Sequence, residues 1–195
     1  MHGPGLVGEM VRLRPFQDSD VERTWELFGD PETQRVTGSR PRTRDELARA
    51  IADVAGDPTT YAWVIASAVQ RDGVFVSDDM LGEIILDRID TVNLSANLRL
   101  TLLPNYRGRG YGRDAIASVL AYAFDPQGLG LHRVSLDVLS INPRARMLYE
   151  SLGFRAEGTL REVYRDGDGW ADMVTMSILE HELERDEAPQ DAGTA

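Results

Sequence analysis

Three glycines at alternate positions, in the stretch "YRGRGYG", separate a strand-like segment from a helix-like one. The preceding segment, "LTLLPN", is apolar and contains a proline near its end. The apolar residues that follow recur at helical spacing, so residues 112–124 are predicted to form a helix that faces the core. Glycine loses more conformational entropy on folding than any other residue, so this density indicates a loop that needs bare backbone. The chain must therefore fold so that a strand, an open loop and a helix follow one another.

The start of such a helix is suited to bind an anion. Its first amide N–H groups have no partner within the helix, and the helix dipole adds partial positive charge there. Without side chains at Gly108, Gly110 and Gly112, a diphosphate can approach these amides, and Arg107 or Arg109 can add charge. A glycine-rich turn that binds nothing is the alternative. The spacing differs from the dinucleotide fingerprint, which has two residues before its third glycine.

Length and composition indicate one domain of ordinary size. The chain has 195 residues, of which 42% are hydrophobic and 27% charged. No apolar run approaches the roughly 18 residues of a membrane span, and residues 1–10 show no secretory signal. We therefore expect no membrane partner and a cytoplasmic location. Residues 1–183 are expected to form the domain, and residues 184–195 an acidic, disordered tail.

The scarce residue types exclude several kinds of site. There is no cysteine, which excludes disulfides, thiolate zinc sites and a cysteine nucleophile. The three histidines, His2, His132 and His181, lie far apart in the sequence, so no metal site is predicted. All 21 basic residues are arginine, so the lysines of a Walker loop or a Schiff base are missing. The net charge of −11 disfavours nucleic-acid binding and favours a cationic ligand.

Hydrophobic periodicity predicts the order of the elements. Strand patterns occupy residues 11–16, 61–69, 80–89, 94–104, 133–139, 154–164 and 170–179. Helical patterns occupy residues 19–29, 43–54, 112–124 and 142–153. In the first helix, Ser19 and Glu22 have capping-box spacing, and Val21, Trp25 and Phe28 mark the predicted inner face. Because helices and strands interleave, the chain is predicted to be a single α/β or α+β domain with a mixed sheet.

Two motifs in this order resemble a known family. Residues 107–112 are similar to the Arg/Gln-x-x-Gly-x-Gly/Ala loop of the GNAT superfamily of acyl-CoA N-acyltransferases. Downstream, "INPRARMLYESLGF" resembles the second signature of that superfamily. The similarity extends over almost all of residues 10–180. Within the superfamily, the sequence most resembles the branch of ribosomal-protein N-terminal and spermidine acetyltransferases. It implies a mixed, mostly antiparallel sheet of about seven strands flanked by about four helices, and N-acetyltransferase activity.

The resemblance also implies which residues hold the cosubstrate, acetyl-CoA. In the family, the loop amides bind the CoA diphosphate and the preceding strand pairs with the pantetheine arm. On this chain the implied diphosphate cradle is Arg107, Gly108, Arg109, Gly110, Tyr111, Gly112 and Arg113. The implied pantetheine contacts are Leu100, Thr101, Leu102, Leu103 and Asn142, and Arg146 is a further implied cofactor-binding residue.

The second signature implies a general acid. Asn142 and Tyr149 are seven residues apart, which on a helix returns to nearly the same face ~10 Å along the axis. In the family this tyrosine protonates the departing CoA thiolate, a role that falls to Tyr149 here. A phenol with a pKa near ~10 and a thiol near ~8.5 are close enough for that transfer, although a thiolate can also leave unaided. The alternative is a core tyrosine whose hydroxyl bonds to backbone.

The general base is less clearly encoded. Many family members have a glutamate in a strand pattern like Ala-Glu-Ile-Gly, where this chain has "ANLR", residues 96–99. Glu83, in "LGEIIL", is the best substitute, and Asp137 and Asp172 are weaker candidates. If no residue serves, bulk water can deprotonate an acceptor of lower pKa, such as a peptide α-amine at ~8, rather than a polyamine.

The sequence leaves the acceptor and one rival function open. The acceptor is a protein N-terminus or a small amine such as a polyamine or an aminoglycoside. The missing glutamate also permits a non-catalytic acyl-CoA sensor or scaffold, and a nucleotide-binding regulator is a third possibility. By resemblance, the acceptor pocket is lined by the first two helices and the long hairpin. The residues there are Trp25, Phe28, Arg35, Trp63 and Tyr164. Their alternative role is packing in the core or on the surface. Relatives in this branch often pair, so a homodimer is also open.

Overall fold

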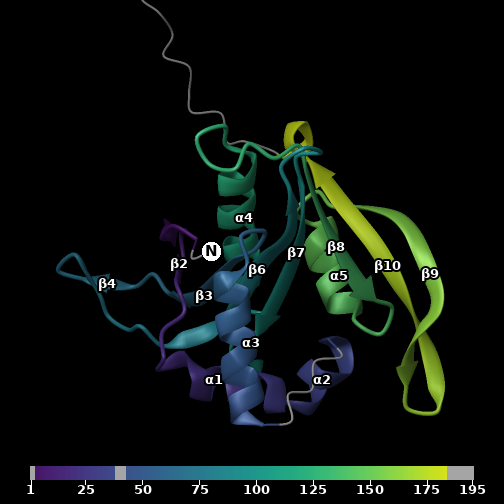
Figure 1. The fold of residues 1–195 in the computed structure, drawn as a ribbon, viewed down its shortest axis with the longest axis horizontal. Helices are drawn as coiled ribbons and strands as arrows, with labels where there is room; N and C mark the ends of the chain where they lie inside the picture. The colour runs from purple at the N-terminus through teal and green to yellow at the C-terminus, as the bar shows by residue number, and fades with distance from the viewer. Residues whose placement is uncertain (1–2, 38–42, 184–195) are drawn as a thin grey trace, which may run out of the picture.

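The structure, a computed structural model, describes residues 3–37 and 43–183. Eight strands form one sheet in the order β1-β2-β3-β6-β7-β8-β10-β9, and β4 and β5 form a separate hairpin (Figure 1). The strands are Leu6–Val7, Val11–Arg14, Tyr61–Ser67, Gln70–Arg71, Val74–Phe75, Met80–Asp90, Ser95–Leu102, Arg133–Leu139, Arg155–Asp166 and Gly169–Leu179. The α-helices α1 to α5 are Asp20–Gly29, Pro31–Thr37, Arg44–Gly56, Tyr111–Phe124 and Pro143–Glu150.

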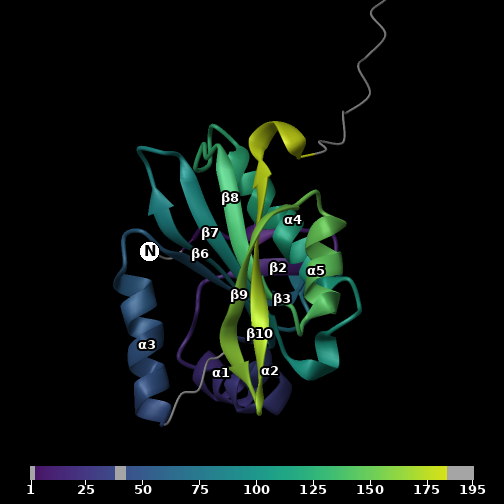
Figure 2. The same ribbon diagram turned by 90° about the vertical axis from the view of Figure 1, so that its right-hand side faces the viewer.

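The helices cover the sheet in two layers. Helices α4 and α5 lie on one face, whereas α3 lies on the opposite side of the sheet (Figure 2). All neighbouring strands pair antiparallel except β7 and β8, which are parallel. The predicted class, a mixed and mostly antiparallel sheet with flanking helices, is therefore confirmed.

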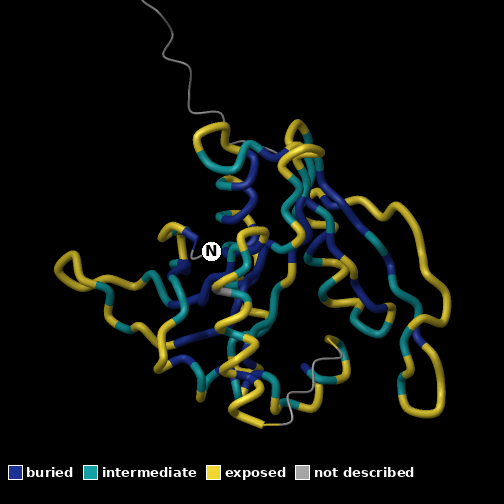
Figure 3. Tube along the Cα trace, in the orientation of Figure 1, coloured by how far each residue is buried: buried dark blue, intermediate teal, exposed yellow. Residues whose placement is uncertain are grey.

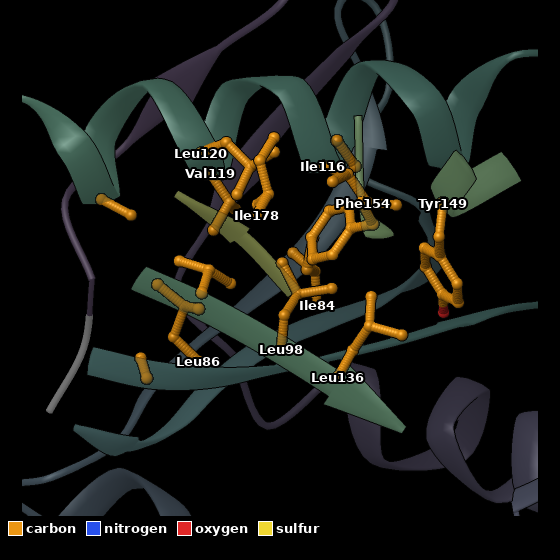
Figure 4. Packing of buried hydrophobic residues seen from close by; sticks show 14 of the residues in the cluster. Ile84, Leu86, Leu98, Ile116, Val119, Leu120, Leu136, Tyr149, Phe154 and Ile178 are labelled. Atoms are coloured by element: carbon orange, nitrogen blue, oxygen red, sulfur yellow. The ribbon is translucent and has the colours of Figure 1, made fainter. Parts of the chain in front are cut away.

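The main core lies between the sheet and α4. The apolar face of α4, predicted from its spacing, is buried completely at Ile116, Val119 and Leu120. These side chains pack against strand residues such as Ile84 and Leu98 (Figure 4). A second, smaller cluster lies under α1 and consists of Leu27, Val64, Met80 and Leu103. Burial of apolar surface at ~25 cal/mol per Å² makes these two clusters the main source of stability.

Helix α1 differs from its sequence prediction. Ser19 makes no capping hydrogen bond, and the buried residues of the helix are Asp20, Thr24 and Leu27. Asp20 is buried because it forms a two-bond ion pair with Arg14 of β2, at 2.7 and 2.8 Å. This pair joins residues six positions apart, and the buried face of the helix differs from the one that the apolar spacing indicated. By contrast, Thr43 caps α3 as predicted, accepting the N–H of Glu46 at 3.1 Å.

Three further elements were not predicted. Helix α2 and the hairpin β4–β5 lie in segments to which no helix or strand was assigned, and the two-residue strand β1 is too short for a periodic pattern. The sheet is therefore larger than expected, with eight strands, and there are five α-helices in the described residues. Residues 184–195, the predicted tail, lie outside the described residues, as does His2.

Two hairpins project from the body of the domain. Nearly all of β9 is exposed, and β4–β5 extends away from the opposite end of the sheet (Figure 3). Leu160 and Trp170 of the β9–β10 hairpin are 51% and 59% exposed. None of the helices in the described part of the chain is long and apolar enough to cross a membrane.

Candidate active site

The sheet opens between its two parallel strands. Strands β7 and β8 pair over three residues only, the last pair being Asn97 and Ser135. Beyond this point, within residues 3–37 and 43–183, β7 pairs only with β6, as far as Leu102, and β8 pairs only with β10, as far as Leu139. The two strands diverge in Figure 1 from the middle of the sheet. Their facing edges therefore offer unpaired backbone, which an extended ligand can bind as an added strand would.

The open edge of β7 is defined by two hydrogen bonds at its end. The N–H of Leu103 donates to Leu81 on the β6 side, at 2.9 Å, whereas the carbonyl of Leu102 accepts from Arg107 Nε at 3.0 Å. Backbone groups of successive strand residues point to alternate sides. Leu100 therefore directs its N–H and C=O towards the open side, as Leu102 does, and Thr101 faces β6, where its partner is Glu83.

The glycine loop follows this edge directly. Gly108 and Gly110 have φ angles of +71° and +91°, a conformation that glycine adopts without steric cost. Gly112 has no such φ, but a Cβ there would lie 3.1 Å from Leu100 and 3.3 Å from Leu102. Two glycines are thus needed for the backbone conformation, and the third allows α4 to pack closely on β7. This agrees with the expectation that the loop needs bare backbone.

The N-terminus of α4 has free amides. The first N–H with a partner along the helix is that of Asp114, which donates to the Gly110 carbonyl at 3.1 Å. The N–H groups of Tyr111, Gly112 and Arg113 take no acceptor in the described residues, and Gly110 has no side chain to cap them. Together with the helix dipole, these amides suit a phosphate group.

The arginines of the loop have different partners. Arg107 turns away from the amides towards α2, where it binds Asp30. Arg113 donates to the carbonyl and hydroxyl of Ser151, at 3.1 and 2.9 Å. Arg109 is exposed and takes no ion-pair partner among the residues described. Of the two arginines expected to add charge at this loop, Arg109 is the one whose guanidinium is available.

Helix α5 begins and ends as its sequence predicts. Asn142 caps it by accepting the N–H of Ala145 at 3.2 Å, and Gly153 has a φ of +95° just past its end. Arg146 pairs with Glu150 along the exposed side, at 2.8 Å. The cap uses the side-chain oxygen of Asn142, so the amide NH₂ group of the same side chain remains available as a donor.

Tyr149 projects from α5 to the margin of the core. It is 7% exposed, and its ring packs against Phe154 with 5.9 Å between the centroids. Burial raises the pKa of Tyr149 to about 12. The hydroxyl makes no hydrogen bond with any described residue, which differs from the backbone-bonded core tyrosine considered as the alternative. In Figure 4 its oxygen lies on the side of the ring away from α4.

Glu83 is a buried carboxyl without a hydrogen-bond partner in the described residues. It lies on β6 opposite Thr101, with 8% of its surface exposed. Burial raises the pKa of Glu83 to about 7, against a smaller lowering by Arg99. The two weaker candidates are engaged elsewhere: Asp137 accepts from Thr175 Oγ1 and Asp172 from the N–H of Glu162, both at 2.8 Å.

The strand position that lacks the family glutamate is occupied by a polar network. Asn97 is buried and donates to Asp87 Oδ1 at 3.0 Å, while Arg99 pairs with Asp87 Oδ2 at 2.7 Å. Asp87 and Glu83 are four residues apart on β6, and the register between them is regular, so their side chains share one face of the sheet. Glu83 therefore lies on the same face as the position where the pattern has a glutamate.

The residues expected to line an acceptor pocket do not gather into one wall. Trp63 is fully buried in the core and donates to the Pro4 carbonyl at 2.8 Å. Trp25 packs beneath Arg44, whereas Phe28 borders the smaller cluster. The other two expected residues, Arg35 and Tyr164, meet around α2 and the β9–β10 hairpin.

Sequence reasoning missed helix α2, although a local signal was present. Asp30 accepts the N–H of Thr33 at 2.8 Å, and Pro31 is the first residue of the helix. An aspartate followed by proline is a typical helix start, but the seven-residue helix is too short for its periodicity to be recognised. No group of three or more histidine or acidic residues in the described part of the chain could hold a metal ion.

Comparisons with known proteins agree with this geometry. The family model for the acetyltransferase (GNAT) domain matches residues 10–155. Spermidine N(1)-acetyltransferase of Vibrio cholerae is 34% identical over 110 residues, which cover 54% of this chain and 62% of that protein. The "Putative ribosomal N-acetyltransferase YdaF" of Bacillus subtilis is 28% identical over 187 residues, covering 91% of this chain and 96% of that protein.

A solved structure shows the same architecture. The crystal structure of spermidine N-acetyltransferase from Vibrio cholerae in complex with CoA and spermine superposes with a TM-score of 0.77 at 26% identity, covering 88% of this chain and 96% of that one. The family model covers most of the domain, including β7, the glycine loop and α5. The chain therefore belongs to the GNAT family of acetyltransferase domains.

Proposed function

We propose that this protein is an acetyl-CoA-dependent N-acetyltransferase that transfers the acetyl group to a primary amine. The observation that carries this proposal is the open edge of β7, which leads directly to the free amides at the start of α4. An extended arm with amide groups can pair along such an edge, while a diphosphate at its end binds the helix N-terminus. The pantetheine and diphosphate of CoA have these two features in this order.

The cofactor contacts follow from the groups that the protein leaves free. The diphosphate is assigned to the amides of Tyr111, Gly112 and Arg113, with Arg109 as the nearby positive charge. On β7 the pantetheine arm pairs with Leu100, because the Leu102 carbonyl is already bonded to Arg107. The remaining amide donor of Asn142 is assigned to the same arm from α5.

The reaction is a direct attack of the amine on the thioester. The amine lone pair forms a C–N bond to the acetyl carbon, the C–S bond breaks, and its electron pair leaves with the CoA sulfur. Tyr149 is assigned as the donor to that sulfur. With its pKa raised to about 12, the phenol stays protonated at neutral pH and is held ready as a hydrogen-bond donor.

Glu83 is assigned as the general base. A primary amine with a pKa near ~10 is mostly protonated at neutral pH and must lose a proton before or during the attack. Burial raises the pKa of Glu83 to about 7, so the carboxylate is partly formed at neutral pH and can accept this proton, directly or through water. This assignment removes the need for an acceptor of unusually low pKa.

A small polyamine is the first acceptor to test. The relatives include an enzyme named for spermidine, and the net charge of −11 attracts cations. A protein N-terminus is the second, because another relative is named for ribosomal N-acetylation. The compared relatives are named as acetyltransferases, and none favours the non-catalytic acyl-CoA sensor that the missing glutamate left open.

The test is the release of free thiol from acetyl-CoA over a panel of amines that contains spermidine, an N-terminal peptide and an aminoglycoside. We expect turnover with at least one amine and a loss of about 10²-fold or more in kcat for Tyr149→Phe. Tyr122→Phe is the matched control, because Tyr122 packs against the same core on α4. Equal thiol release in the two variants would remove Tyr149 from the mechanism. If the unaltered protein released no thiol with any of the amines, the proposed enzymatic activity would be refuted.

Two finer features accompany this function as proposals. Among the described residues, strand β9 pairs only with β10, so its outer edge can pair with a second copy and form a homodimer. Light scattering coupled to size-exclusion chromatography tests this, with two copies per particle as the expected result. A cytoplasmic location also remains a proposal, to be checked by fractionation.

A further inference from the structure

Helix α2 is attached to both sides of the opening between β7 and β8. At its start, Arg107 from the loop after β7 binds Asp30 at 2.8 Å and Glu32 at 2.7 Å. Further along, Arg35 donates to both carboxylate oxygens of Asp166, the last residue of β9, at 2.7 and 2.5 Å. Both views place α2 near the tip of the β9–β10 hairpin (Figures 1 and 2). The helix therefore bridges the two halves of the sheet at the end where they diverge.

The attachment at Arg107 is firm. Its side chain is only 19% exposed, and it also donates to Thr33 Oγ1 at 2.6 Å and to the Leu102 carbonyl at 3.0 Å. Burial alone would raise the pKa of Asp30, but hydrogen bonds from Arg107 and Thr33 outweigh it and hold that pKa below its usual value. Charge-assisted bonds of this kind are roughly twice as strong as neutral ones. The start of α2 is thus fixed to the end of β7.

The attachment at Arg35 is specific but easily opened. Arg35 is 56% exposed and Asp166 21% exposed, so water screens their attraction. The hydrogen bond from Arg35 lowers the pKa of Asp166. Tyr164 adds a longer contact, from its hydroxyl to the Gln34 carbonyl at 3.4 Å. The two hydrogen bonds fix the orientation of Arg35 relative to Asp166, whereas the solvent exposure of both side chains keeps this ion pair weak.

We propose that Arg35 and Asp166 are a positioning pair for the amine acceptor. By joining α2 to the β9–β10 hairpin, the pair holds the helix across the open end of the strands, so that an amine approaching the thioester is held against α2. The inference rests on the proposed function, since it assigns a substrate to that end of the sheet. Because Arg35 and Asp166 bond to each other and not to the α4 amides, we expect their loss to change the binding of the amine and not that of acetyl-CoA.

Steady-state kinetics of the full chain test this pair. Arg35→Gln and Asp166→Asn each raise KM for the amine about two- to fivefold, leave KM for acetyl-CoA unchanged, and are not additive in the double variant. The exchanged pair, Arg35→Asp with Asp166→Arg, recovers part of the loss. Hydrogen exchange of residues 31–37 is faster in both single variants, which reports the released helix independently of turnover.

Arg155→Gln is the matched control. Arg155 begins the same strand and forms a similar exposed pair with Glu182 at 2.8 Å, far from α2, so its loss leaves both KM values unchanged. An unchanged amine KM in Arg35→Gln and Asp166→Asn, or an equal change in the KM for acetyl-CoA, would overturn the positioning role while the enzyme itself stands. Absence of thiol release by the unaltered protein would instead refute the proposed function and this inference with it.

Discussion

The carboxylate of Asp114 accepts the main-chain N–H of Met10 at 2.8 Å, although the two residues are 104 positions apart. The same carboxylate accepts the N–H groups of Glu9 and Val11, at 3.1 and 2.8 Å. A Cβ on Gly8 would lie 2.6 Å from it, so the turn before β2 is shaped to this side chain. The first turn of α4, which carries the free amides, is thereby fixed to the N-terminal strands.

Asp114→Asn therefore destabilises the protein. An amide has one acceptor oxygen, and its NH₂ group would face backbone donors, so at least one of the three N–H groups loses its partner. We expect a loss of about 1–3 kcal/mol in the free energy of unfolding, measured by denaturant titration. Asp125→Asn is the control, because the Asp125 carboxylate accepts only the exposed N–H of Gln127 among the described residues. This variant changes the free energy of unfolding by less than about 1 kcal/mol. Equal losses in the two variants would contradict the special role of Asp114.

Gly108→Ala separates cofactor binding from backbone strain. Gly108 has a φ of +71° and open space around its missing Cβ, so alanine costs about 1 kcal/mol in strain without a clash. Gly167, in the β9–β10 turn, has a φ of +61° and equally open space. Both variants lose similar stability, but only Gly108→Ala weakens CoA binding, by about tenfold in Kd by calorimetry. A Kd that is unchanged in Gly108→Ala would place the diphosphate elsewhere.

The pH dependence of the rate identifies the base. With the pKa of Glu83 raised to about 7, kcat rises with pH through that value as the carboxylate forms, provided the amine is saturating. Glu83→Gln lowers kcat by about 10²-fold or more and removes this limb of the pH profile. Asp137→Asn, the exposed carboxylate bonded to Thr175, keeps the limb. If the limb persists in Glu83→Gln, another group or bulk water takes the proton.

The same residue makes stability depend on pH. The pKa of Glu83 rises from 4.5 to about 7 on folding, so between these values the folded protein binds more protons than the unfolded chain. The free energy of unfolding contributed by this group is therefore fully present below pH ~4.5 and is lost as pH rises through ~7, by up to about 3 kcal/mol. Glu83→Gln is then more stable than the unaltered protein at pH 8 but not at pH 4.5, by chemical denaturation. Asp53→Asn, on the exposed side of α3, controls for the lost charge. If the difference in the free energy of unfolding between Glu83→Gln and the unaltered protein did not vary with pH, the raised pKa of Glu83 would be contradicted.

Much of the site was predictable because its signals are local. The strand before the loop, the three glycines and the helix after them depend on residues a few positions apart, and the structure has them in that order. The caps at Thr43 and Asn142 are local for the same reason, since each side chain bonds to an amide three residues on. The Ser19 cap was wrong: Ser19 makes no capping hydrogen bond, and Asp20 pairs with Arg14 six positions earlier, a contact that neither the capping-box spacing nor the apolar spacing contains.

The sequence by itself determined the longer helices and strands, the bare-backbone loop and the family to which they belong, because backbone conformation and hydrophobic periodicity are set by near neighbours. Only the tertiary structure decided where β7 and β8 part, which way Arg107 turns, and that Glu83 is buried with no hydrogen bond to the residues described. These depend on strand register and on contacts between residues tens of positions apart. The pKa of Glu83 in particular follows from what surrounds its carboxyl in space, which neighbours in the chain do not specify.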